Sequence, residues 1–178
     1  RARFFAKGTL HEDWAYKLQY EFASSNANID GILDAFIDYK PLNIRIGHFE
    51  EPFSLQNMTS DKYLSYNERA MSNIFTEGRN IGVQHSRSGD NWSLAGGIFG
   101  DGRKTETSGN NNEGWGVSAR ATIAPINEAD QKLHLGVSAG QRYLGGDKTI
   151  NFSERPETHI TNSKIVNTDP LNGSAKFS

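Results

Sequence analysis

The stretch WAYKLQYEF, residues 14–22, alternates between large apolar or aromatic residues and smaller or polar ones. This period of two places each set of side chains on its own face of a β-strand. Similar alternation recurs in residues 29–39, 42–46, 81–84, 92–98, 115–123 and 133–142, and residues 1–10 complete the set. The pattern predicts an all-β chain in which residues 1–145 form about eight antiparallel strands.

The connections between these expected strands alternate in length. Short ones are expected at residues 11–13, 40–41, 86–91 and 125–131, and longer ones at 24–28, 54–79, 101–114 and after 144. Tight turns at one rim and long loops at the other are typical of bacterial outer-membrane β-barrels. The polar residues 146–178 are expected to form a long external loop or an incomplete strand region.

The composition excludes several classes of protein. Hydrophobic residues make up 35% of the 178 positions, and the mean hydropathy is −0.64. No stretch approaches the roughly 18 apolar residues that a membrane-spanning helix needs. A transmembrane barrel can have this composition, because only alternate residues face lipid. The absence of cysteine excludes thiol chemistry, and a net charge of −2 gives no argument for nucleic acid as a partner.

The two predicted faces of the strands differ in chemistry. One carries aromatic residues, mostly near strand ends, as interfacial girdles of membrane barrels do. The other is charged and includes Lys17, Arg45, Arg120 and Arg142. These cations would face a water-filled lumen in a barrel, or solvent on the outside of a soluble β-sandwich. Exposure of Trp14, Tyr16, Tyr20 and Trp92 around a sheet would distinguish the barrel from the sandwich.

No set of residues predicts catalysis, a metal site or a cofactor. The five histidines are scattered along the chain, and the adjacent Glu50 and Glu51 lie at a strand end. Carboxylates there are more often solvated, or paired with a nearby cation, than used in acid–base chemistry. We therefore expect a protein that is not an enzyme.

Residues 47–69, GHFEEPFSLQNMTSDKYLSYNER, resemble the phosphate-selective porin O and P family. The similarity covers roughly residues 1–145, and the matching positions in this segment are Gly47, Phe49, Pro52, Phe53, Ser54, Leu55, Thr59, Ser60, Glu68 and Arg69. The resemblance implies a sixteen-stranded outer-membrane barrel that assembles as a homotrimer in lipid. This chain would supply about half of the barrel strands.

The resemblance also implies roles for individual residues. The loop 54–79 would fold into the lumen, where Lys62 binds an anion, Arg69 assists and Asp34 shapes the site. Arg1 resembles one rung of the family's row of luminal arginines. Two positions depart from the phosphate-selective members, because Asn57 and Ala15 stand where those proteins carry lysines.

The sequence therefore predicts an outer-membrane porin for passive diffusion of small polar solutes, with a preference for anions such as phosphate or polyphosphate. Two alternatives remain at this point. One is a soluble secreted β-sandwich that binds carbohydrate through its aromatic residues. The other is a structural or adhesion barrel with a plugged lumen, which would be favoured if the loop 54–79 lay outside the barrel.

Overall fold

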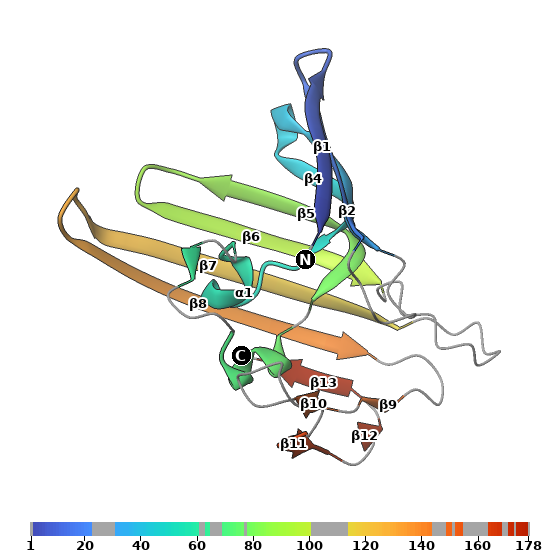
Figure 1. The fold of residues 1–178 in the computed structure, drawn as a ribbon. Helices are drawn as coiled ribbons and strands as arrows, with labels where there is room; N and C mark the ends of the chain where they lie inside the picture. Colours follow the sequence, from blue (N-terminus) through green and yellow to red (C-terminus); the bar gives the residue numbers. More distant parts are fainter. Residues whose placement is uncertain are drawn as a thin grey trace.

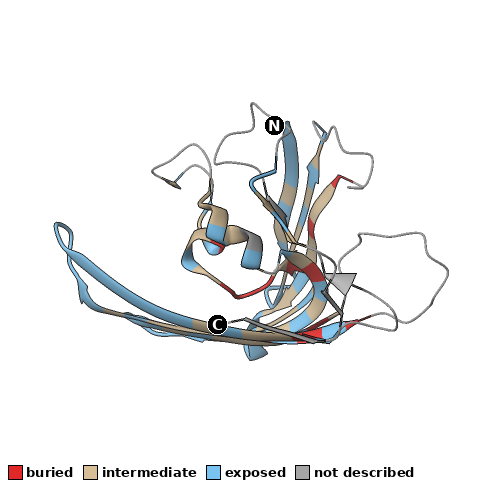
Figure 2. Ribbon diagram, turned by 90° about the horizontal axis from the view of Figure 1, so that it is seen from below, coloured by how far each residue is buried: buried red, intermediate tan, exposed pale blue. Residues whose placement is uncertain are grey.

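The computed structural model describes residues 2–22, 31–60, 63–64, 69–76, 78–100, 114–143, 149–150, 152–154, 164–168, 171–172 and 174–177. Within these residues the chain forms one large antiparallel sheet, strongly bent, with a short helical loop on its concave side (Figures 1 and 2). The predicted all-β, antiparallel fold is confirmed.

Eight strands follow one another along the chain and across the sheet. They are β1 (Arg3–Leu10), β2 (Trp14–Glu21), β3 (Ile32–Tyr39), β4 (Ile44–Glu50), β5 (Arg79–Ser88), β6 (Trp92–Gly100), β7 (Trp115–Asn127) and β8 (Lys132–Tyr143). Each strand pairs with the next, and the ninth position at the β8 edge is taken by β13 (Ser174–Phe177). This is the meander of an up-and-down barrel wall.

The connections divide between the two rims as the sequence predicts. Those after β1, β3, β5 and β7 contain three or four residues, and the one after β3 holds the 3-10 helix η1 (Lys40–Leu42). The connections after β2, β4 and β6 are longer. The one after β4 contains α1 (Leu55–Met58) and η3 (Met71–Phe75).

The segment predicted as a polar loop or incomplete strand region contains short strands in the structure. Antiparallel pairs join β10 (Ser153–Glu154) to β11 (Val166–Asn167), and β12 (Leu171–Asn172) to β9 (Thr149–Ile150). Because β13 pairs with β8, the sheet continues beyond the eight strands that alternation alone indicates.

The apolar face of the sheet is open to its surroundings. Trp14 and Tyr20 are each 38% exposed and Trp92 is 46% exposed, while Tyr16 is half-buried. No second sheet covers this face in the part of the chain that the structure describes. A soluble sandwich would bury these side chains between two layers, so that alternative is not supported. We call this the outer face.

Aromatic side chains of the outer face gather near the two rims. Trp14 and Tyr39 pack together at the short-turn rim, with ring centroids 4.6 Å apart. Near the long-loop rim, Trp115 stacks on Tyr143 at 4.7 Å. Two aromatic belts that flank an apolar band are the expected arrangement for a strand wall in a lipid bilayer.

The opposite, concave face, which we call the inner face, holds a small aromatic core at the bend. Phe49 and Phe99 are each 1% exposed and meet edge to face at 5.6 Å, and Phe36 meets Phe49 at 5.9 Å. Gly47 permits this packing. Its φ of 138° is unfavourable for other residues, and a β-carbon there would meet the carbonyl oxygen of Ala35.

Among the described residues, no helix is both long and apolar enough to cross a membrane.

Candidate functional site

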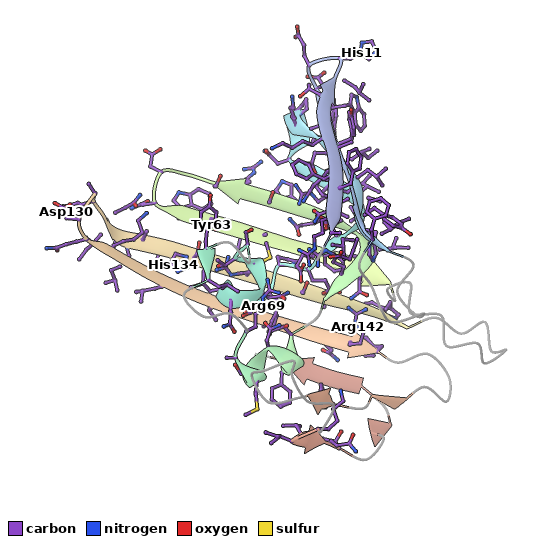
Figure 3. The ribbon with its side chains drawn as sticks, viewed as in Figure 1. His11, Tyr63, Arg69, Asp130, His134 and Arg142 are labelled. Carbon is purple, nitrogen blue, oxygen red and sulfur yellow. The ribbon has the colours of Figure 1, made fainter. Side chains whose placement is uncertain are left out.

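The loop between β4 and β5 lies over the inner face of the sheet rather than continuing past its rim. Figure 2 shows its helical part on the concave side, and Figure 3 places Tyr63 and Arg69 in front of β7 and β8. The strands that flank it end at Glu50 and begin at Arg79. For the described residues, this direction argues against the alternative in which the loop lies outside the barrel.

The root of the loop is attached to strands far along the chain. Glu51 follows β4 directly, and its carboxylate accepts hydrogen bonds from Asn80 on β5, at 2.7 Å, and from Arg142 on β8. Three residues later, the backbone N–H of Ser54 donates to the hydroxyl of Ser138 at 3.4 Å. These bonds direct the chain from β4 across the inner face to β8.

Arg69, which the resemblance assigns to the anion site, lies in this loop and is half-buried. Its guanidinium donates to the backbone carbonyls of Gln56, at 3.3 Å, and Thr59, at 3.2 Å. The Gln56 side chain accepts in turn from the N–H of Ala70 at 3.2 Å. Arg69 therefore ties the two arms of the loop together, and contact between Arg69 and an anion stays a prediction.

Asp34 is the other described member of the predicted anion site. Its carboxylate is 5% exposed and pairs with Lys17 at 2.6 Å and with Arg79 at 2.9 Å. Arg79 also reaches Glu50 at 2.8 Å. Both oxygens of Asp34 are thus engaged by cations of the wall. Lys62 and Arg1 lie outside the described residues, so their predicted roles stay predictions.

The remaining predicted luminal cations differ in their partners. Arg45 forms a two-point ion pair with Asp38, at 2.7 and 3.0 Å, and stacks on Phe36 at 3.8 Å. Arg142 is directed inward but is only 6% exposed, because it pairs with Glu51 beneath the loop. In this state its guanidinium is covered and paired, so Arg142 is not placed to meet solutes.

Arg120 is the exception among these cations. It is half-buried on β7, between Ala95 of β6 and Ser138 of β8, on the same face as Ser118. No carboxylate pairs with its guanidinium within the described ranges. Ser118 is 4% exposed, and its hydroxyl has no hydrogen-bond partner there. Arg120 and Ser118 thus combine a positive charge with an unsatisfied hydroxyl.

Charge on the strands differs in sign from charge on the whole chain. Strands β1 to β8 contain nine lysines and arginines against four carboxylates, an excess of five, although the chain has a net charge of −2. The four carboxylates are Glu21, Asp34, Asp38 and Glu50, and each pairs with a cation of the sheet. One of the nine cations, Arg87, lies opposite Leu94 on the outer face. Eight cations against four carboxylates remain, so the inner wall is positive although the chain is acidic.

The structure describes both positions that depart from the phosphate-selective members, Asn57 and Ala15. Asn57 is 7% exposed in α1, and its side chain is hydrogen-bonded to Glu50. Ala15 lies on the inner face of β2, opposite Asp38. Asn57 therefore helps hold α1 to the end of β4.

Sequence reasoning alone did not identify the attachments of the loop. The sequence predicts that Glu50 and Glu51 are solvated or paired with a nearby cation. In the structure both are paired, Glu50 with Arg79 and Glu51 with Arg142. Asn80 carried no signal of its own. A single sequence does not show which of several arginines a given carboxylate will meet.

The chain matches the family model described as phosphate-selective porin O and P over residues 1–176. It is also similar to Porin O of Pseudomonas aeruginosa, with 25% identity over 157 residues. The alignment covers 84% of this chain and 36% of that relative, so the chain spans about a third of the relative's length. No solved structure matches the chain.

Proposed function

We propose, from the premise that this chain belongs to the phosphate-selective porin O and P family, that the full-length protein is a porin through which small anions diffuse passively. Members of the family are outer-membrane porins of Gram-negative bacteria, and porins are channels rather than enzymes. Phosphate is the anion that the family description indicates. Polyphosphate is a further candidate solute, and we propose a homotrimer in lipid as the assembled form.

The positive inner wall is the observation that supports a preference for anions. Every carboxylate of β1 to β8 is paired, while Arg120 has no carboxylate partner among the described residues. An anion that enters a narrow pore loses part of its hydration, and arginine donors can replace it. Paired cations such as Lys17 and Arg45 contribute less, because a carboxylate already satisfies them.

The loop 54–79 would provide the narrow part of this pore. Its described residues lie over the inner face, and Arg69 and Tyr63 belong to it (Figure 3). Lys62, in the same loop, is the residue that we assign to anion binding at the constriction, and we assign supporting roles there to Arg69 and Asp34. Several weak sites suit conduction better than one strong site, because each anion must also leave.

Swelling of liposomes that contain the full-length protein tests the proposal. In isotonic potassium phosphate, these liposomes should swell faster than empty ones, because phosphate enters through the pore and water follows. An isotonic solution of large dextran should produce no such difference. Swelling in phosphate no faster than that of protein-free liposomes would contradict the porin assignment.

A further inference from the structure

The loop between β4 and β5, which we call the inward loop, is bonded through its first residue, Glu51, to strand β8. Glu51 is 1% exposed, and its carboxylate meets Arg142, which lies 91 residues later in the chain and is 6% exposed. Asn80 donates a second hydrogen bond to the same carboxylate oxygen. A buried carboxylate and a buried guanidinium are tolerated only when each compensates the other. Loss of either charge would therefore leave the other buried without its partner.

The sheet beneath this ion pair is shaped to admit it. Arg142 lies opposite Gly116 of β7, and a β-carbon at position 116 would come within 3.0 Å of the guanidinium carbon and Nε. The other end of the guanidinium donates to the carbonyl oxygen of Gly100, at the end of β6, at 3.1 Å. Arg142 thus lies flat across the neighbouring strands, with its charge directed at the loop.

One residue close behind Glu51 is held in an unfavourable backbone conformation. Ser54 has φ of 60° and ψ of 141°, a region that residues other than glycine rarely occupy. Such a conformation persists only where its surroundings over-determine it. Here the surroundings are Phe53, which is 6% exposed and lies near Gly140 of β8, and the bond from the Ser54 N–H to Ser138.

We propose that the Glu51–Arg142 ion pair is a latch that positions the inward loop against β8 and thereby sets the width of the pore. This inference rests on the proposed porin function. It makes Glu51 and Arg142 positioning residues, which act on the solute through the loop rather than by contact. The Arg3–Glu21 ion pair, by contrast, joins the neighbouring strands β1 and β2.

A thiol introduced into the loop can report on the latch, because this chain contains no cysteine of its own. The parent protein, which lacks the introduced thiol, gives the background labelling rate. Ser54→Cys keeps the backbone N–H that meets Ser138 and adds a thiol next to the attachment point. In the full-length, folded protein we would measure the rate at which a membrane-impermeant maleimide labels this thiol. Glu51→Gln should raise that rate by about tenfold or more, because an unpaired buried Arg142 disfavours the docked loop.

Further variants complete the design. Arg142→Gln should raise the labelling rate by a similar factor, and the double variant should exceed neither single variant, because either change already opens the latch. Glu21→Gln is the matched control. It makes the same substitution in a wall ion pair away from the loop, and it should leave the labelling rate unchanged. If Glu51→Gln fails to fold, Arg142→Lys should give a smaller rise, because it retains charge but not the guanidinium fork.

Single-channel recording adds a readout that general destabilisation would not produce. With the latch open, each channel should show larger current fluctuations than the parent protein, while Glu21→Gln should not. Equal labelling rates and equal current noise in all variants would overturn the latch. If the parent protein forms no channels while Glu51→Gln still accelerates labelling, the porin function fails and the positioning of the loop stands.

Discussion

Arg120 provides a sharp prediction about anion passage. Among the predicted luminal cations that the structure describes, Arg120 is the one without a carboxylate partner in the described ranges, and replacing it with Gln removes its charge. Its side chain is half-buried at the wall, so an anion beside it remains close to water. Two unit charges about 4 Å apart attract by about 1 kcal/mol in bulk water and by about 4 kcal/mol at an effective dielectric constant near 20.

The lower value is appropriate for a water-filled lumen, and 1 kcal/mol corresponds to about a fivefold change in binding. We therefore expect Arg120→Gln to raise the phosphate concentration that halves chloride current by about fivefold. The assay is single-channel recording in planar bilayers at fixed chloride with increasing phosphate.

Arg87→Gln is the matched control, because Arg87 lies opposite Leu94 on the outer face of the sheet. The same loss of charge there should leave the phosphate block unchanged. Equal block in the parent protein and in Arg120→Gln would refute the reasoning. So would an equal loss of block in both variants, because net charge rather than position would then control the channel.

Three further perturbations test other parts of the account. Gly47→Ala should lower the free energy of unfolding in urea by about 1–3 kcal/mol, because Gly47 has a positive φ and a β-carbon there would meet the Ala35 carbonyl oxygen. Gly96→Ala should be nearly neutral, because the atoms nearest to a β-carbon at position 96 would be 3.6 Å away. Val137 is 68% exposed on the outer face, midway along β8, so Val137→Arg should lower the free energy of unfolding in lipid vesicles by about 2–4 kcal/mol. Gln19→Arg, on the inner face, should leave that free energy nearly unchanged. Lys62→Ala should weaken phosphate block of chloride current, and an unchanged block would remove Lys62 from the constriction.

The strands of the sheet could be predicted from sequence because alternation is a local property. In residues 14–22, the apolar or polar character of each side chain indicates whether it lies on the outer or the inner face of the sheet. The exposed Trp14 and Tyr20 agree with that assignment. The short turns follow from the same pattern, since each lies between two alternating runs. The strands β9 to β12 could not be predicted in this way, because each has only two residues and is too short to show alternation.

The ion-pair partners of the predicted site residues could not be predicted from the sequence alone. Asp34 and Lys17 are both on the inner face by alternation, but their contact depends on a register in which Asp34 lies opposite Gln19. A register shift between Gln19 and Tyr20 is part of that pairing. The inward course of the loop depends on contacts between Glu51 and strands that form much later in the chain.

The zero-current potential of the full-length protein across a potassium chloride gradient tests the central claim most directly. A positive inner wall whose carboxylates are all paired should pass chloride more readily than potassium. We therefore expect a potential with the sign of an anion-selective channel, and this potential should move toward zero in Arg120→Gln. A potential with the sign of a cation-selective channel, or the absence of any channel, would contradict it.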